Sequence, residues 1–413
     1  MQRKNNLKTV FTEKQITVLQ ELKKEDWFIT TLHGAVRSGK TYLNNFIFLM
    51  ELRRVARIAK EQGISKPMYI LAGFSMSSIQ DNILTELNNV FDIELKFDKF
   101  GAFELMGVKV IQTTHGNKTG VGRIRGMTAY GAYVNEASLA VESVFEEIKT
   151  RCSGVGARII ADTNPDQPEH WLKKNYIDKS ETNNDMKAFQ FVLDDNTFLD
   201  ERYVRNLKKA TPSGMFYDRA INGMWVTGKG AIYCDFDKNI HYRNSETMPQ
   251  YFSDYFIGLD FGYEHWGSLV LFGKSDGAYY LIKEVSAQHQ QIEYWVEQLQ
   301  EISYSYGLDI PIYCDSARPE HVAKIGESGL NAIFANKSVL SGIETVAGLL
   351  KTGKLFFNED GISHFKDEIY NYVWDSKTGK PVKMHDDTMD AIRYALHSHL
   401  YNPLKITLAT SPF

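Results

Sequence analysis

The stretch from His33 to Thr41, HGAVRSGKT, spaces its glycines, lysine and threonine so that they can hold the phosphates of a nucleotide. From Gly34 to Thr41 it fits the pattern G-x-x-x-x-G-K-[ST] at every fixed position. Backbone N–H groups of such a loop, and of the helix after it, surround phosphates because they present unpaired donors and partial positive charge. The lysine of the pattern reaches the β- and γ-phosphates, and its Ser/Thr hydroxyl holds Mg²⁺. The residues predicted to bind ATP are Gly34, Arg37, Ser38, Gly39, Lys40 and Thr41, with Thr41 also a metal ligand.

A second set of chemical groups lies near the other end of the chain. Asp260, Asp315 and the pair Asp387 and Asp390 are carboxylates at three separate positions, and the pair shares a helix face because its spacing is i, i+3. Such carboxylates repel one another when they converge, unless two divalent cations neutralise them. Two Mg²⁺ or Mn²⁺ ions about 4 Å apart activate water and stabilise the leaving oxygen of a phosphodiester. Each aspartate taken singly is more often a turn or cap residue.

Two polar residues follow expected strands in the first half. Glu136 comes after an apolar strand and is a candidate general base for ATP hydrolysis, although a solvated strand-end acid is the alternative. The preceding Asn135 stands where an acid that holds Mg²⁺ is expected, so that Mg²⁺ would rest on Thr41 and waters. Asn164 follows another strand and is placed to sense the γ-phosphate, while an Asn-Pro turn is an equal alternative.

Three further residues complete the candidate nucleotide site. Arg123 and Arg125 lie in the Gly-rich segment TGVGRIRGMT, where an arginine can stabilise the charge of a transferring phosphoryl group in its own or a neighbouring subunit. A solvated loop or a contact to a DNA phosphate is an equally good interpretation. Gln15, before the first strand, is a candidate to bind the adenine edge through its amide.

The elements that must position the first set of residues alternate between strand and helix. An apolar strand over 27–32 precedes the loop, and a helix over 42–60 follows it. A second helix is expected over about 77–90. Further strands are expected at 68–72, 108–112, 129–134 and 157–161. This order predicts an α/β fold, a P-loop ATPase domain with a doubly wound, mostly parallel sheet.

The second half has a different order. Strands at 256–262, 269–272 and 279–282 are joined by short connections and are therefore expected to be antiparallel. A helix over 291–306, a strand over 310–315 and a last helix over 386–399 follow, with Asp386 as its N-cap. This order is typical of the ribonuclease-H-like nuclease fold, which needs acids at these three positions. The predicted domains are an ATPase core at 1–190, a lid and linker at 191–245, and a nuclease domain at 246–413.

Composition excludes several classes of protein. The chain has 413 residues, 43% hydrophobic and 24% charged, which suits a globular protein with two cores. No apolar run approaches a membrane span, and the polar start MQRKNN does not resemble a signal peptide. Cys152, Cys234 and Cys314 lack metal-ligand spacing and are expected to be reduced. Since the net charge is −4, contacts to DNA must come from local basic groups.

The blocks HGAVRSGKT, AYVNEAS, ADTNP, GLDFGY, YCDSARPE and HDDTMDAIRYAL, in this order, resemble the large terminase subunit of tailed bacteriophages. The resemblance spans residues 11 to 398. It implies a motor that hydrolyses ATP to move double-stranded DNA into a procapsid and cuts the DNA concatemer. It also implies that Glu136 catalyses hydrolysis, that Asn164 couples it to movement, and that Asp260, Asp315 and Asp390 hold the nuclease metals, with Asp387 adjacent.

The same resemblance implies partners and a location. The partners are double-stranded DNA, the portal protein, the small terminase subunit and further copies of the chain in a ring, without a membrane. The location is the host cytoplasm, with transient attachment to the portal vertex. Two alternatives remain from the sequence: an ATP-dependent helicase or repair nuclease, for which no further helicase motif follows Pro165, and an assembly factor with a vestigial nuclease.

Overall fold

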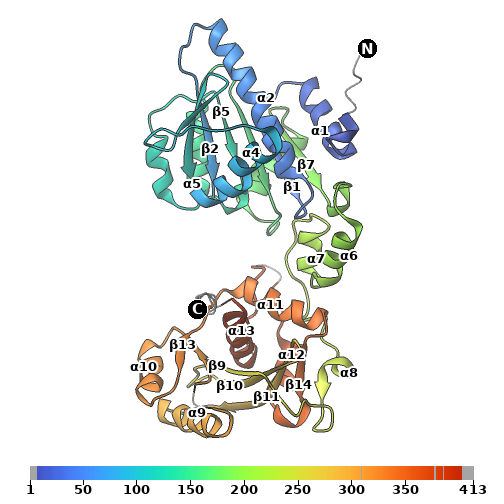
Figure 1. Ribbon diagram of the computed structural model, residues 1–413, viewed down its shortest axis with the longest axis vertical. Helices are drawn as coiled ribbons and strands as arrows, with labels where there is room; N and C mark the ends of the chain where they lie inside the picture. Colours follow the sequence, from blue (N-terminus) through green and yellow to red (C-terminus); the bar gives the residue numbers. More distant parts are fainter. Residues whose placement is uncertain (1–6, 308, 376–377, 385, 402–413) are drawn as a thin grey trace, which may run out of the picture. The chain divides into compact units, whose positions relative to one another are not determined.

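The computed structural model describes residues 7–307, 309–375, 378–384 and 386–401. The chain forms two compact units (Figure 1). Unit 1 comprises Met1–Val204 and Tyr217–Thr227, and unit 2 comprises Arg205–Phe216 and Gly228–Phe413.

Unit 1 is built on a seven-stranded sheet with the order β3-β4-β2-β5-β6-β1-β7. All neighbouring strands are parallel except β3, which pairs antiparallel with β4. This confirms the doubly wound, mostly parallel sheet. The strands are β1 Ile29–Gly34, β2 Met68–Gly73, β3 Phe103–Leu105, β4 Val108–Thr114, β5 Gly131–Val134, β6 Arg158–Thr163 and β7 Met186–Phe191.

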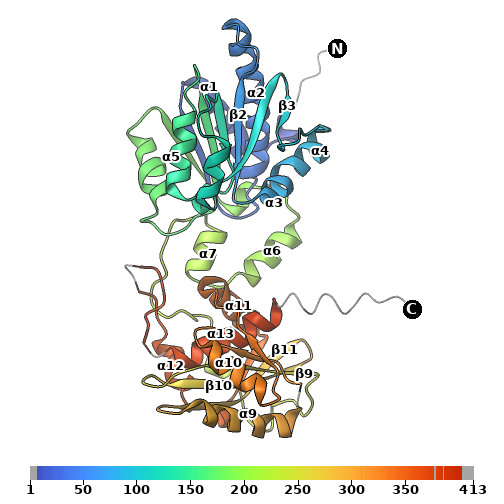
Figure 2. The same cartoon turned by 90° about the vertical axis from the view of Figure 1, so that its left-hand side faces the viewer.

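Helices cover both faces of this sheet, since alternate strand residues enter two separate cores (Figure 2). Leu71 and Ile160 pack with α2 on one face, whereas Ile70 and Ile159 pack with α5 on the other. The helix expected near 77–90 is present and contains one π-helical turn, Gln80–Leu84. The helices of unit 1 are α1 Glu13–Lys24, α2 Lys40–Glu61, α3 Met76–Ile79, α4 Thr85–Phe91 and α5 Glu142–Arg151.

The region predicted as a lid and linker contains α6 Glu201–Ala210 and α7 Met215–Ala220. Its residues are divided between the two units. The limits 191–245 for a separate lid and linker stay a prediction.

Unit 2 contains a second seven-stranded sheet, with the order β13-β12-β9-β10-β11-β14-β8. β9, β10 and β11 are antiparallel neighbours, as the sequence predicts, and β12 then joins β9 in parallel. The strands are β8 Tyr242–Arg243, β9 Asp254–Asp260, β10 Gly267–Ser275, β11 Ala278–Ala287, β12 Ile312–Cys314, β13 Ala332–Phe334 and β14 Leu355–Asn358.

The helices of unit 2 pack on opposite faces of its sheet. Ile257 and Leu259 of β9 form a core with Trp295 of α9, while Phe256 stacks on His399 of α13 at 3.8 Å between ring centroids. Gly258 lets α13 approach, because a Cβ atom there would lie 2.1 Å from a backbone oxygen of that helix. The helices are α8 Lys238–His241, α9 Ile292–Tyr306, α10 Pro319–Glu327, α11 Val339–Lys351, α12 Phe365–Asn371 and α13 Asp387–Leu400.

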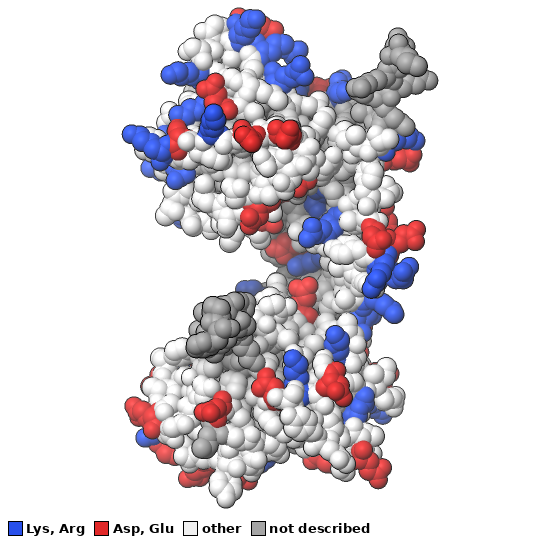
Figure 3. All heavy atoms as spheres, in the orientation of Figure 1, with Lys and Arg blue, Asp and Glu red and all other residues white. Residues whose placement is uncertain are grey.

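Charge is mixed over the surface drawn in Figure 3, where lysines and arginines are interspersed with acids. Such mixing fits the small net charge of −4. The three cysteines are free thiols, two of them buried. Among the helices of the described residues, none combines the length and apolar character that crossing a membrane requires.

Candidate nucleotide and nuclease sites

The phosphate-binding loop joins the carboxyl end of β1 to the start of α2, the context that the motif requires. Gly34 has φ 138°, and a Cβ atom there would lie 1.9 Å from Phe191 O, so that only glycine fits. Gly39 has φ 88°, in the left-handed region that favours glycine. Between them, Ser38 Oγ donates a hydrogen bond of 2.7 Å to Ala35 O.

Lys40 lies folded against the loop that precedes it. Its ammonium group donates to Gly34 O at 2.9 Å, to Ala35 O at 2.5 Å and to Asn164 Oδ1 at 3.2 Å. Burial lowers the pKa of Lys40 to about 8. The structure therefore brings Lys40 together with Asn164, which follows β6.

Two amide side chains hold the loop from its flanks. Gln15 Nε2 donates to Gly39 O at 3.0 Å, and Gln15 Oε1 accepts a bond from the start of α1. Asn196 Nδ2 donates to Arg37 O at 2.7 Å, and the Arg37 side chain is exposed. Thr41 is half-buried in the first turn of α2. The adenine contact of Gln15 stays a prediction, since both atoms of its buried amide are engaged here.

Glu136 begins the turn after β5, and its backbone is left-handed, with φ 54° and ψ 48°. Burial raises the pKa of the Glu136 carboxyl, and the charge of Asp162 raises it further. Asp162 Oδ1 accepts bonds from Asn135 Nδ2 at 2.7 Å and from the Glu136 backbone N–H at 3.0 Å. The candidate base is therefore attached to a buried acid on the neighbouring strand β6.

Arg123 and Arg125 lie at the end of a 3₁₀ segment, Lys118–Arg123, and just after it. Both side chains are exposed, and Arg123 Nη1 donates to Gln112 O at 3.3 Å. Exposure leaves them accessible to a neighbouring molecule.

The residue before the loop, His33, is buried and accepts a bond of 3.2 Å from Trp225 Nε1 through its Nδ1 atom. The neutral ring therefore carries its proton on Nε2. Burial lowers the pKa of His33 to about 4, and the charge of Lys40 adds to this effect.

In unit 2 the predicted acids line one cleft, at the carboxyl ends of two strands and the start of a helix. Asp260 is the last residue of β9, and Asp315 follows β12, which pairs with β9 in parallel. The Asp315 backbone N–H donates to Leu259 O at 3.0 Å and extends this pairing. Asp387 and Asp390 lie in the first turn of α13, which packs over β9.

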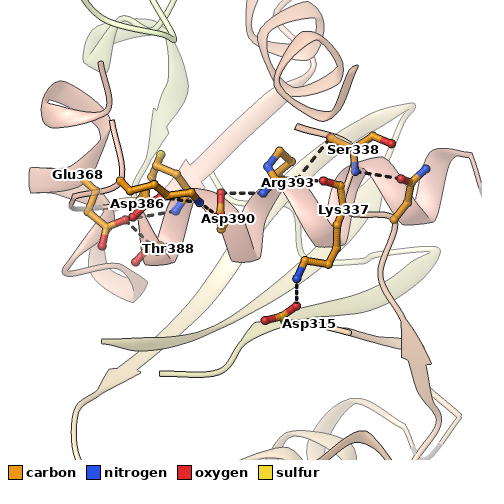
Figure 4. Close-up of polar contacts among 11 residues, drawn as sticks. Asp315, Lys337, Ser338, Glu368, Asp386, Thr388, Asp390 and Arg393 are labelled. Atoms are coloured by element: carbon orange, nitrogen blue, oxygen red, sulfur yellow. Dashed lines mark hydrogen bonds and ion pairs between the residues drawn. The ribbon is translucent and has the colours of Figure 1, made fainter. Parts of the chain in front are cut away.

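Three cations stand against these acids, and the contacts of Arg393 with Asp390 and of Lys337 with Asp315 are drawn in Figure 4. The Arg393 guanidinium lies 2.8 Å from Asp390 Oδ1, and the Lys337 ammonium contacts the Asp315 carboxylate. Lys383 pairs with Asp390 at 3.3 Å and also with Asp386.

The acids also act on one another. Asp260 is the most affected: burial raises the pKa of this carboxyl well above its usual range, and the charges of Asp390, Asp315 and Asp387 raise it further, in that order. Burial and then the charge of Asp386 raise the pKa of Asp387. All these acids line a single cleft of about 1310 Å³.

The acids of the cleft repel one another, since their charges add to the effect of burial in raising the pKa of Asp260, and bound divalent cations would relieve this repulsion. Four carboxylates facing one cleft form a hard oxygen donor set of the kind that Mg²⁺ and Mn²⁺ prefer. Within the described ranges, no three His, Cys, Asp or Glu side chains are yet gathered closely enough to hold a metal ion. Lys337, Lys383 and Arg393 each form an ion pair with one of these carboxylates. The chemistry of this donor set, carboxylates that line one cleft, fits such ions.

The start of α13 is fixed differently from the expectation. Asp386 is the N-cap residue, as predicted, but its side chain makes no capping hydrogen bond. Glu368 of α12 accepts instead from the backbone N–H groups of Thr388 at 2.8 Å and Met389 at 3.2 Å. Asp386 is drawn to Lys383 at 3.0 Å, which explains the difference.

A phosphate-binding loop on a parallel sheet, followed by an acid cleft on a mixed sheet, defines a chain with an ATPase unit and a metal-dependent nuclease unit. Residues 32–239 match the family described as terminase large subunit, T4likevirus-type, N-terminal, and residues 257–399 match the terminase RNaseH-like domain. The chain belongs to the terminase large subunit family. It thus joins an ATPase to a ribonuclease-H-like nuclease, the enzyme of phage DNA packaging.

Solved structures of a large terminase match nearly the whole chain. The large terminase from a thermophilic bacteriophage is 25% identical, with a TM-score of 0.79 over 94% of this chain and 99% of that one. The same phage protein in complex with ATP-γ-S is 26% identical, with a TM-score of 0.72 over 93% and 98% of the two chains. Its complex with ADP is 25% identical, with a TM-score of 0.74 over 95% and 100%. No curated protein matches the sequence.

Several residues of these sites were not predicted. Asp162 lies inside the block ADTNP, so its place at a strand end was a signal that could have been used. Arg393 follows Asp390 at i, i+3, which also places it beside that acid. Lys337 and Glu368 carry no local signal, because only the tertiary fold brings them to the acids.

Proposed function

We propose that the chain is the motor and nuclease subunit that packages viral DNA, with ATP hydrolysis at the loop of unit 1 and DNA cutting at the acid cleft of unit 2. The observation that carries this proposal is the presence of a phosphate-binding loop with a buried lysine in one unit and converging acids in the other. The large terminase of the thermophilic phage has been crystallised with ADP and with ATP-γ-S, which supports ATP as the nucleotide.

In this proposal the loop from Gly34 to Gly39 surrounds the phosphates with its backbone N–H groups, aided by Ser38 and Arg37. Lys40 exchanges its carbonyl partners for phosphate oxygens. This exchange is favourable because the buried ammonium group has only neutral partners in the structure, and hydrogen bonds to a charged phosphate are stronger. Thr41 holds Mg²⁺, which neutralises phosphate charge, and Gln15 contacts the adenine.

Glu136 is the proposed general base that accepts a proton from the attacking water. Its raised pKa suits this role, since a more basic carboxylate accepts a proton more readily. Asn164, bonded to Lys40, is proposed to sense the γ-phosphate and to couple hydrolysis to movement. Arg123 or Arg125 completes the site of a neighbouring subunit.

In the cleft of unit 2, Asp260, Asp315 and Asp390 are the proposed ligands of two Mg²⁺ or Mn²⁺ ions, with Asp387 beside them. The ions would supply an activated water and charge for the leaving oxygen of the phosphodiester. Lys337, which stands at Asp315 and is partly exposed, is suited to contact a DNA phosphate, whereas the buried Arg393 would hold Asp390 in place.

The proposed partners are double-stranded DNA, the portal protein of the procapsid, the small terminase subunit and further copies of the chain in a ring. The proposed location is the host cytoplasm, with attachment to the portal vertex during packaging. Mixed rather than uniformly basic surface charge implies that DNA contacts are local.

Packaging in a defined mixture tests the proposal. Purified chain, procapsids with portal, concatemeric DNA and ATP should protect DNA from added nuclease, and Lys40→Ala should abolish this protection. Protection by Lys40→Ala equal to that of the parent would contradict the assignment of the loop as the motor site.

A further inference from the structure

Asn135 occupies the position at which an acid is expected, and every polar atom of this residue is engaged. The backbone N–H donates to Ala72 O at 2.9 Å, and the carbonyl contacts His115 Nε2 at 2.7 Å. The side-chain Oδ1 accepts from Asn82 Nδ2 at 3.0 Å, while Nδ2 donates to Asp162 Oδ1 at 2.7 Å. The amide thus uses both its acceptor and its donor, which a carboxylate cannot do.

An aspartate at position 135 would therefore meet Asp162 directly. Asp162 is 1% exposed, so solvent would not screen the repulsion between two carboxylates at hydrogen-bond distance. Such a pair is stable only when it shares a proton, which removes one of the two charges. The Asn135 amide on β5 and the Asp162 carboxylate on β6 therefore form a hydrogen-bonded pair that carries a single negative charge.

Asp162 also fixes the residue proposed as the catalytic base. It accepts from the Glu136 backbone N–H at 3.0 Å and, through Oδ2, from Tyr133 Oη at 2.8 Å. The left-handed backbone of Glu136 costs about 1 kcal/mol or more in a residue with a Cβ, so the surroundings must hold it. Asp162 accepts hydrogen bonds from Tyr133, Asn135 and Glu136 at the end of β5 and so helps to stabilise this backbone conformation.

The same contacts reach the helix that begins at Lys40. Asn82 lies in the π-helical turn after β2, and its carbonyl accepts from Asn45 Nδ2 of α2 at 3.1 Å. π-Helical turns often occur at functional sites. Here the turn aims Asn82 at Asn135, and so joins α2 to the end of β5.

We propose that Asp162 is the acid of the nucleotide site, a positioning residue on β6 that supplies the charge absent from Asn135 and holds Glu136 in its catalytic conformation. The inference rests on the proposed ATPase function of unit 1 and names a residue that this function needs. Asp162 acts through Asn135 and Glu136, because its oxygens are already bonded to their donors.

The substitution Asp162→Asn isolates the charge. The new amide can keep all three contacts, with its oxygen toward Asn135 and Glu136 and its NH₂ toward the Tyr133 hydroxyl, which can accept. The kcat for ATP hydrolysis should fall by about tenfold or more, while KM and the affinity for ADP change by less than about threefold. Asp92→Asn, which removes an exposed charge from the same unit, should leave both unchanged.

An exchange variant tests the matching of the pair. Asn135→Asp alone should be the slowest variant, because it opposes two buried carboxylates. Combined with Asp162→Asn, it has one acid and one amide again and should regain about tenfold of the kcat lost. Its kcat should stay below that of the parent, because the group in the place of Asp162 Oδ1 would be NH₂, which can donate to the carboxylate at position 135 but cannot accept from the Glu136 backbone N–H. A double variant no faster than Asn135→Asp would overturn the proposed pairing.

Two measurements separate this inference from the function on which it rests. If Lys40→Ala hydrolyses ATP at the parent rate, the ATPase assignment itself fails. If Lys40→Ala is inactive and Asp162→Asn hydrolyses at the parent rate, only the role of Asp162 fails. Loss of ADP binding in Asp162→Asn would also overturn the role of Asp162, because the residue would then be structural.

In a Glu136→Gln background, Asp162→Asn should lower the kcat by less than about threefold further, since Asp162 acts through Glu136.

Discussion

Arg393 Nη2 lies 2.8 Å from Asp390 Oδ1, and both side chains are almost fully buried at the start of α13. A second nitrogen, Nη1, donates to Lys337 O at 3.2 Å, and the ammonium of Lys337 contacts Asp315. Gly342 leaves room for this arrangement, because a Cβ atom there would lie 2.6 Å from Arg393 Cγ. One buried arginine thus connects two of the acids proposed to bind metal.

Arg393→Gln should weaken the nuclease site. Removing this cation leaves the buried Asp390 with only the more exposed Lys383 as a charge partner, which is expected to cost about 3 kcal/mol in metal-free protein. Cutting of plasmid DNA should need more Mn²⁺ to reach half its maximal rate, and Mn²⁺ should restore part of the lost stability. Arg318→Gln removes an exposed arginine that also lines the cleft and is the matched control for folding. Equal stability of the parent and Arg393→Gln would contradict this account.

Glu136→Gln should bind ATP and Mg²⁺ but hydrolyse ATP very slowly. Glutamine keeps the shape of the side chain and loses the basic carboxylate, so that chemistry falls while binding persists. Turnover and nucleotide affinity, measured on the same preparation, check this. A decrease of less than about tenfold, or ~1.4 kcal/mol of barrier, would assign the base to another residue.

The stability of unit 1 should decrease in mild acid because of His33. Its pKa is lowered to about 4 in the folded chain, so the folded state binds this proton less readily than the unfolded state. The contribution is fully present above about pH 6.5 and is lost as the pH falls toward 4, to a limit of about 3 kcal/mol. Hydrogen exchange of the β1 segment should show this loss, with a shallower pH dependence in His33→Gln, whose oxygen can still accept from Trp225. An identical pH dependence in both proteins would exclude His33 as its source.

Arg123 and Arg125 should act between subunits. An Arg→Ala subunit keeps its own loop, and a Lys40→Ala subunit keeps its arginines, so mixing them can restore or poison activity only if the arginines act in trans. ATPase rates should therefore depart from the weighted average as the mixing ratio is changed in the presence of procapsids. A strictly linear dependence would place the arginines in their own subunit's site or outside catalysis.

Local patterns predicted the parts of this molecule that depend on neighbouring residues. The loop from Gly34 to Thr41 and the three antiparallel strands beginning at Asp254 were predicted because turn residues and strand periodicity are local signals. The acids Asp260 and Asp315 were predicted to converge because strand order implied it, and they do line one cleft.

What the sequence did not predict depends on contacts between distant segments. From the sequence, Asn135 stands where an acid that holds Mg²⁺ is expected. The contact of its amide with Asp162 on the neighbouring strand is visible only in the fold. Glu368 replaces Asp386 as the cap of α13, a choice that only the packing of α12 decides. Lys337 is separated from Asp315 in the chain by a helix and a strand, and no spacing rule joins them.

The central claim is that one chain carries two chemically independent sites, one in each unit. The most direct test measures ATP hydrolysis and plasmid cutting side by side in Lys40→Ala and Asp390→Asn. Lys40→Ala should lose hydrolysis and keep metal-dependent cutting, while Asp390→Asn should lose cutting in Mg²⁺, regain part of it in Mn²⁺, and hydrolyse ATP at the parent rate. Hydrolysis by Lys40→Ala at the parent rate, or cutting by Asp390→Asn as fast as by the parent in Mg²⁺, would contradict the account.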